Sequence, residues 1–155
     1  MAISGTHNLQ ILRGLTSNRS LLSCQPSGAV VDLWMKDDSS GRQRWQFIPI
    51  TGMKDVYNIK IAGGMTTNRK YLSCTSDGTK VDLWSVDDGS GRQRWVVTPV
   101  KNSPTCNTYL IKIFGGVSTA RKYLSCTPDG IIVDLWTLDD NSGRQRWQLQ
   151  EIWAA

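Results

Sequence analysis

Apolar and polar side chains alternate over short stretches of this sequence, and no stretch shows helical spacing over about ten or more residues. In the middle third of the chain, the alternation predicts short strands at residues 57–62, 71–74, 80–84 and 94–98. The segments between them are rich in Gly, Ser and Asp, which is the composition of turns. The pattern therefore predicts an all-β protein.

Copies of the motif Val-Asp-Leu-Trp divide the sequence into three similar units. Their aspartates are Asp32, Asp82 and Asp134, so successive copies are 50 and 52 residues apart. Such a period is typical of a repeated supersecondary unit that cannot bury its apolar face alone. Three units are too few for a propeller, which typically has about 4 to 8 blades. We therefore predict a single β-trefoil domain over residues 1–155, with repeats at about 7–52, 53–102 and 103–153.

Each copy contains two tryptophans for which the pattern predicts different roles. Because side chains alternate across a strand, Val81 and Leu83 share one face, and Asp82 and Trp84 share the other. Packing requires the aliphatic pair to point inward, which leaves the acid and the indole on the surface. We assign the later tryptophan of each copy to the core, with its N–H and the nearby glutamine amide needing internal partners. The core set is Trp45, Trp95 and Trp147, and the surface set is Trp34, Trp84 and Trp136.

A surface aromatic beside an acid is an arrangement that suits a sugar. The ring covers the apolar C–H face of a pyranose, while carboxylate, amide and guanidinium groups bind its hydroxyls. The segments 43–45, 93–95 and 145–147, each Gln-Arg-Trp, resemble the Gln-x-Trp motif of ricin-B-type β-trefoil lectins, once per repeat. The resemblance spans essentially the whole chain, which also looks like small cytoplasmic lectins of fungi and bacteria. It implies a multivalent agglutinin for galactose or N-acetylgalactosamine glycans, with up to three shallow sites and a role in defence.

The resemblance also implies which residues form each site. The family's aromatic is matched by the surface tryptophans, and a polar residue two positions earlier is matched by Asp32, Asp82 and Asp134. The amide residue before the glutamine is replaced by arginine, and the family's second-strand aspartate by serine. Either the Val-Asp-Leu-Trp aspartates supply the displaced carboxylate, or the arginines favour an acidic sugar. The arginines are Arg42, Arg92 and Arg144, and the serines are Ser23, Ser73 and Ser125.

A pair of aspartates follows each surface tryptophan, before Ser and Gly. We expect these pairs to organise a turn. They match the loop that closes the family's site, so the first aspartate of each pair is a further expected contact. These are Asp37, Asp87 and Asp139. A calcium loop is less favoured, because residues 37–41 lack the alternating ligands and the distal glutamate.

Simpler structural roles are open for the same residues. Asp32 can form an ion pair with Arg42 or Arg44, and an exposed pair contributes only about 0 to 1 kcal/mol. Trp34 can cap the barrel instead of forming a platform. The basic residues that begin each second strand, Arg19, Arg69 and Arg121, are expected to be solvated strand edges.

Composition excludes several other functions. The net charge is +5, and acidic and basic residues are interleaved, so no nucleic acid is expected as partner. The single histidine, His7, can form neither a catalytic triad nor a metal cluster, so we expect neither an enzyme nor a cofactor.

The cysteines and the apolar stretches bear on the compartment. Because Cys24, Cys74 and Cys126 occupy equivalent places, we expect reduced, partly buried thiols, and Cys106 is an extra in a linker. The sequence begins with no signal-peptide pattern and has no run of membrane-spanning length. We expect a cytoplasmic protein without membrane insertion.

Two rival functions are open. A trefoil protease inhibitor would act through one asymmetric loop, for which residues 101–107 are the candidate, and a symmetric scaffold would bind no ligand at all. Trp153 lies beyond the last repeat, where it can close the barrel or join a homodimer interface. Packing is its expected use.

Overall fold

The computed structural model describes residues 3–101 and 107–152, and this part of the chain contains twelve strands in three groups of four. Each group has strands of six, four, four and five residues, in that order. Repeat one comprises β1 (Thr6–Ile11), β2 (Leu21–Cys24), β3 (Val31–Trp34) and β4 (Trp45–Pro49). Repeat two comprises β5 (Val56–Ile61), β6 (Tyr71–Cys74), β7 (Val81–Trp84) and β8 (Trp95–Pro99). Repeat three comprises β9 (Thr108–Ile113), β10 (Tyr123–Cys126), β11 (Val133–Trp136) and β12 (Trp147–Glu151).

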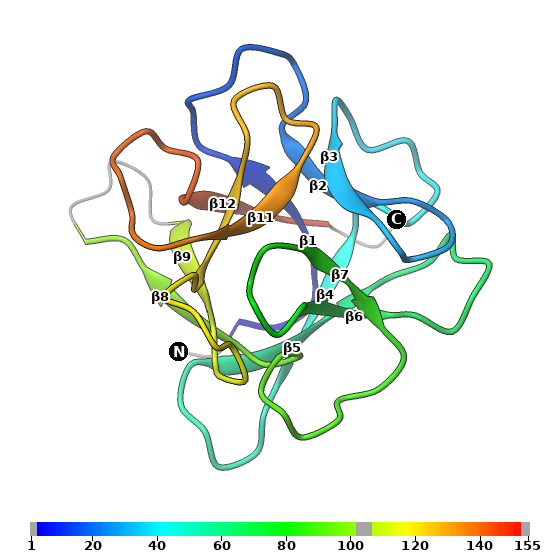
Figure 1. Ribbon diagram of the computed structural model, residues 1–155. Coiled ribbons are helices and arrows are strands. Elements are labelled where there is room, and N and C mark those ends of the chain that lie inside the picture. Colours follow the sequence, from blue (N-terminus) through cyan, green and yellow to red (C-terminus); the bar gives the residue numbers. More distant parts are fainter. Residues whose placement is uncertain (1–2, 102–106, 153–155) are drawn as a thin grey trace.

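The first and last strands of the repeats form a closed barrel. Antiparallel pairing runs from β1 to β4, β5, β8, β9 and β12, and returns from β12 to β1 (Figure 1). The closing pair extends from His7 opposite Glu151 to Ile11 opposite Trp147. Closure pairs these six strands on both sides and leaves no free edge among them.

The remaining strands form three hairpins, β2–β3, β6–β7 and β10–β11, and each pairs with the first strand of its own repeat. Strands β3, β7 and β11 contact one another, so the hairpins meet around a common axis. A six-stranded barrel with three converging hairpins is the β-trefoil architecture, which confirms the predicted fold.

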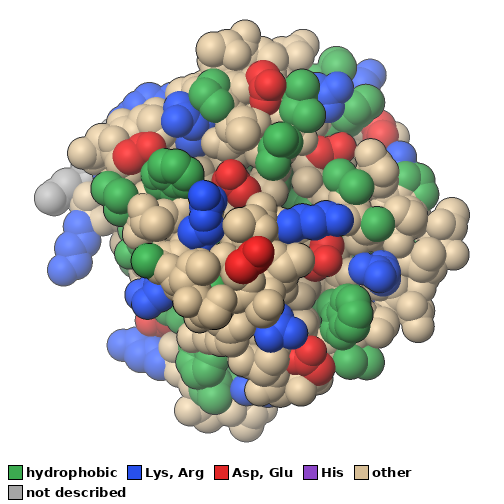
Figure 2. All heavy atoms as spheres, in the orientation of Figure 1, with side chains coloured by type: hydrophobic (Ala, Val, Ile, Leu, Met, Phe, Trp, Pro, Cys, Tyr) green, Lys and Arg blue, Asp and Glu red, His purple; other side chains and the backbone are tan. Residues whose placement is uncertain are grey.

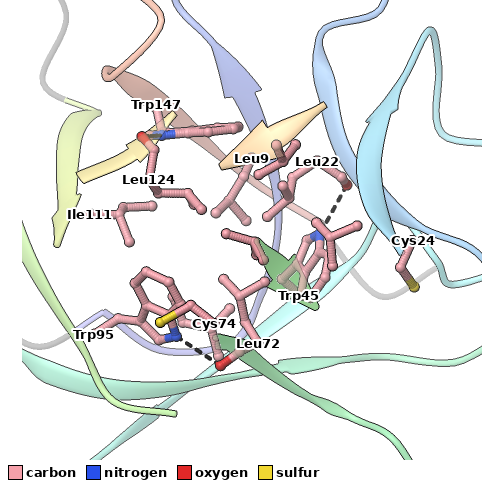
Figure 3. Close-up of a cluster of buried hydrophobic side chains, with 14 of the residues drawn as sticks. Leu9, Leu22, Cys24, Trp45, Leu72, Cys74, Trp95, Ile111, Leu124 and Trp147 are labelled. Carbon is pink, nitrogen blue, oxygen red and sulfur yellow. Dashed lines mark hydrogen bonds between the residues drawn. The ribbon is translucent and has the colours of Figure 1, made fainter. Parts of the chain in front are cut away.

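The core is built around the three tryptophans predicted for it. Trp45, Trp95 and Trp147 have no exposed surface, and leucines from all three repeats pack with them. Their indole N–H groups donate to the carbonyl oxygens of Leu22, Leu72 and Leu124, at 2.9, 2.9 and 3.0 Å (Figure 3). Each large aromatic is therefore buried with its one polar atom satisfied.

The thiols of Cys24, Cys74 and Cys126 are free and buried, as predicted. Each ends the second strand of its repeat, and Figure 3 shows Cys24 and Cys74 on different sides of the core. Burial raises the pKa of each thiol to about 12, which keeps all three protonated and unreactive. Cys106 lies outside the described residues.

The face in Figure 2 carries basic and acidic side chains interspersed among apolar ones. Within residues 3–101 and 107–152, no helix is long and apolar enough to cross a membrane. Most of the loop proposed for protease inhibition, residues 102–106, and Trp153 lie outside the described residues.

Candidate functional site

Three equivalent pockets lie beside the hairpins, one in each repeat. Each is lined by the aspartate and tryptophan of Val-Asp-Leu-Trp, by the arginine before the Gln-x-Trp glutamine, and by that glutamine. Their cavity volumes are about 210, 270 and 170 Å³ in repeats one, two and three. The structure thus brings together three of the four residue types predicted for each site. These are Asp32, Trp34 and Arg42; Asp82, Trp84 and Arg92; and Asp134, Trp136 and Arg144.

The floor of each pocket is fixed by the glutamine. In repeat two, Gln93 is buried, its amide donates to Ser73 Oγ at 2.9 Å, and its Oε1 accepts the backbone N–H of Asp88 at 3.0 Å. The same pairs of bonds recur in the other repeats. One side chain therefore links the second strand to the loop that borders the pocket, and the predicted need for internal partners is confirmed.

The carboxylate of Asp82 lines the pocket, and within the described residues no other side chain forms a hydrogen bond or an ion pair with it. Asp82 lies directly opposite Ser73 on the neighbouring strand, and both side chains line the cavity. Burial raises the pKa of Asp82, while the charges of Arg69, Lys80 and Arg92 oppose the rise. Burial likewise raises the pKa of Asp32 and Asp134.

The ion pair considered for Asp32 is absent. In the described part of the chain, no ion pair joins Asp32 to Arg42 or Arg44. Arg44 instead binds Asp37, with Nε at 2.8 Å from Oδ2. The carboxylate of Asp32 is therefore available to a ligand.

The first aspartate of each pair is a structural residue that does not line the pocket. Asp87 accepts hydrogen bonds from Arg94 Nε at 2.8 Å and from Asn58 Nδ2 at 3.1 Å. Burial alone would raise the pKa of Asp87, but these bonds and one from the Gly89 N–H outweigh it and lower the pKa. Asp37 and Asp139 form the equivalent ion pairs with Arg44 and Arg146. The structure therefore does not bring Asp37, Asp87 or Asp139 into the candidate sites.

The second aspartate of each pair lines the pocket in its place. Asp88 is exposed, and hydrogen bonds from the hydroxyl and the backbone N–H of Ser90 lower its pKa. It is therefore ionised over a wide pH range. The equivalents are Asp38 and Asp140.

One face of each surface tryptophan is covered by an arginine. The guanidinium carbon of Arg69 lies 5.1 Å from the centroid of Trp84, and Arg69 Nη1 donates to the carbonyl of Leu83 at 3.1 Å. Arg19 and Arg121 cover Trp34 and Trp136 in the same way, at 5.0 and 5.4 Å. These arginines are therefore not simply solvated strand edges. A guanidinium over an indole is attractive and holds the ring in place.

The pocket arginines reach across to the next repeat. Arg42 Nη1 lies 3.5 Å from the carbonyl oxygen of Gly64, and Arg92 and Arg144 reach Gly116 and Gly14 at 3.4 and 3.3 Å. Gly64 has φ of +80°, and a Cβ there would lie 2.7 Å from Arg42 Cγ. Glycine is therefore required both for the backbone conformation and for the close approach of the arginine.

The turn after each second strand supplies a wall that the sequence did not indicate as part of a site. The wall residues are Gln25 and Pro26, Thr75 and Ser76, and Thr127 and Pro128. Their turn composition was evident, but turn composition alone does not show on which side of a hairpin a cavity lies.

Comparisons with known proteins support the fold. No family model matches this sequence, and no curated protein matches it. Among solved structures, the designed three-fold symmetric protein ThreeFoil matches with a TM-score of 0.71 and 19% identity, over 96% of this chain and 99% of that chain. The Polyporus squamosus lectin, solved with the epitope Neu5Acα2-6Galβ1-4GlcNAc, matches with a TM-score of 0.70 and 15% identity, over 97% of this chain but only 50% of its own. SeviL, solved with the asialo-GM1 saccharide, matches with a TM-score of 0.67 and 12% identity, over 97% of this chain and 100% of that chain. At such low identities, these similarities establish a common β-trefoil fold.

Proposed function

We propose that this protein is a multivalent lectin whose three pockets bind terminal galactose or N-acetylgalactosamine. The observation that carries the proposal is the threefold recurrence of one constellation. In each repeat an indole at the surface, exposed in Trp84 and Trp136 and partly exposed in Trp34, lines the same cavity as a guanidinium and a carboxylate that forms no ion pair within the described residues.

The groups of one pocket complement a pyranose. Because Arg69 covers one face of Trp84, the indole has one face left for the C–H face of a sugar. Asp82 and Asp88 accept hydroxyl protons, and Arg92 donates to hydroxyl oxygens. The sugar would satisfy the half-buried carboxylate of Asp82, which has no hydrogen-bond donor from another side chain in the described residues.

The position of the Asp82 carboxylate supports a preference for galactose-type sugars. The ricin-B-type lectins that the sequence resembles have an aspartate where this chain has Ser73. Asp82 is the direct cross-strand neighbour of Ser73 and lines the same cavity. The acid is therefore shifted by one strand within the pocket, and the Polyporus lectin is a structural neighbour solved with a glycan that contains Galβ1-4GlcNAc.

Repetition favours binding over catalysis. A glycosidase needs two carboxylates in one asymmetric cleft, whereas the polar groups here recur in every repeat. Single shallow pockets of this kind bind with about 4 to 6 kcal/mol, which corresponds to millimolar or sub-millimolar affinity. Three pockets engaging one glycan-dense surface gain on the order of 10² to 10⁴ in avidity. Agglutination, with a role in defence, is the expected result.

The test is a glycan array probed with the wild type and with the triple variant W34A/W84A/W136A. Phe114→Ala is the control, because Phe114 is an aromatic side chain with 46% exposure outside the three pockets. We expect the wild type and the control to bind terminal galactose or N-acetylgalactosamine, and the triple variant to lose binding while its circular dichroism is unchanged. A folded wild type that bound no glycan would refute the lectin function. Glycan binding retained by the triple variant would refute the assignment of the binding sites to the three pockets.

A further inference from the structure

The three pockets differ at one rim position that bears on the group attached to the sugar. Residues 30, 80 and 132 precede β3, β7 and β11, and alternation places each on the face of the pocket aspartate two positions later. They are Val30, Lys80 and Ile132, and all three are exposed. Their carbonyls accept the N–H groups of wall residues 25, 75 and 127, at 3.0, 2.9 and 2.9 Å. This position is therefore held at the edge of each cavity.

Repeats two and three form a charge-matched pair apart from this position. Each places two arginines and three aspartates in or around its pocket. In repeat two they are Arg69, Arg92, Asp77, Asp82 and Asp88, and in repeat three Arg121, Arg144, Asp129, Asp134 and Asp140. Lys80 is thus an extra cation in repeat two, where repeat three has an isoleucine.

Lys80 forms no ion pair within the described residues. The carboxylate of Asp77 is held in its own turn, where Oδ1 accepts hydrogen bonds from Thr75 and Thr79. The field of Lys80 reaches the cavity, since it is among the charges that favour the ionised form of Asp82. The repeat-two pocket also has the largest cavity volume of the three, about 270 Å³, and it has Ser76 where repeat three has Pro128.

We propose that residue 80 and its equivalents select the charge of the group attached to the bound sugar. The repeat-two pocket takes glycans that carry an anionic substituent, a sulfate or a carboxylate, and the repeat-three pocket takes neutral ones. Lys80 is the specificity-determining residue, because an exposed ammonium pairs with an anion whereas Ile132 offers only an apolar contact. The assignment rests on the proposed function, whose sites it distinguishes from one another.

The test is site-resolved titration by NMR with lactose, 3′-sulfolactose and 3′-sialyllactose at low ionic strength. The indole N–H signals of Trp84 and Trp136, assigned from Trp→Phe variants, report the two pockets separately. We expect Trp84 to report about two- to fivefold tighter binding of one or both acidic probes than of lactose, as for an exposed ion pair, and Trp136 to report no such preference. The preference should shrink as salt is added.

Two reciprocal variants distinguish the local effect of Lys80 from the effect of the protein's overall positive charge. K80I should abolish the preference at Trp84, and I132K should create it at Trp136. Lys54→Ile removes the same charge from an exposed turn outside the pockets, and should change neither. The two acidic probes distinguish sulfate from carboxylate.

The outcomes separate this assignment from the proposed function. An acidic preference at Trp84 that survived in K80I, or its absence from the wild type while lactose bound, would overturn the assignment and leave the lectin function standing. Indole signals that stayed unchanged with all three probes would overturn both the galactose-type specificity and this assignment.

Discussion

Replacing Gln93 by methionine should destabilise the fold by roughly 2 to 4 kcal/mol. Gln93 is 1% exposed and holds Ser73 Oγ at 2.9 Å and the Asp88 N–H at 3.0 Å. Methionine has a similar length but can replace neither bond, and each buried polar group left unpaired costs about 1 to 3 kcal/mol. Two such groups would cost about 2 to 6 kcal/mol together. Because Asp88 lies near the surface, where water can reach its N–H, we expect the lower half of this summed range. For a domain of this size, the melting temperature should fall by about 4 to 16 °C.

Thermal unfolding followed by circular dichroism measures this loss, and a second variant tests its cause. In Gln93→Met with Ser73→Ala, the buried hydroxyl is removed together with its partner, so we expect about 1 to 2 kcal/mol to be recovered. Hydrogen exchange should also show faster exchange of the Asp88 amide, because its acceptor is gone. A melting temperature within about 2 °C of the wild type, or a double variant less stable than Gln93→Met, would refute the reasoning.

Three further predictions concern the site and the thiols. Arg69→Met removes the cation behind Trp84, so calorimetry should show weaker glycan binding in the repeat-two pocket while the fold is retained; unchanged affinity would show that the arginine does not position the ring. Because the pKa of Asp82 is raised, the native state binds this proton more tightly than the unfolded state. Glycan binding should therefore weaken as pH falls through the pKa of Asp82, which lies above 3.8, while the contribution of Asp82 to stability rises. Replacing Asp82 and its equivalents Asp32 and Asp134 by asparagine should remove this pH dependence of binding. Iodoacetamide at pH 8 should leave Cys74 and its two equivalents unlabelled in the native protein, since their pKa is raised to about 12, but label them in guanidinium, as peptide mass spectrometry would show.

Strand alternation was sufficient to predict which side chains of the repeated motif lie in the core. The pattern of Val81 and Leu83 inward and of Asp82 and Trp84 outward is the one observed. The burial of Trp95 in the core was predicted from the apolar residues that directly follow it. These predictions hold because the side-chain period of a strand is fixed by backbone geometry and needs no information about distant segments.

The roles of loop residues could not be predicted in this way. Asp87 and Asp88 are adjacent and chemically identical, yet one binds Arg94 and the other lines the pocket. Their orientations depend on turn geometry that has no simple period. The stacking of Arg69 on Trp84 was missed for a related reason, because the contact depends on the path of the chain between two strands and not on either strand alone.

The pockets, like the core, depend on contacts between repeats. The wall residue Pro26 of repeat one accepts the N–H of Thr66 from repeat two at 2.9 Å, and Gly28 lies so close to Arg69 that an added Cβ would be 2.7 Å from the arginine Cβ. Arg69 in turn covers Trp84, so the wall of one pocket supports the platform of the next. The same contacts lead from Ser76 to Ser118 and from Pro128 to Thr16, and so return to repeat one. A single repeat would therefore lack a closed core. It would also lack the contacts that hold the pocket wall and the arginine that covers the tryptophan. Each pocket therefore depends on neighbouring repeats, which is a physical reason for the chain to keep all three copies of the motif.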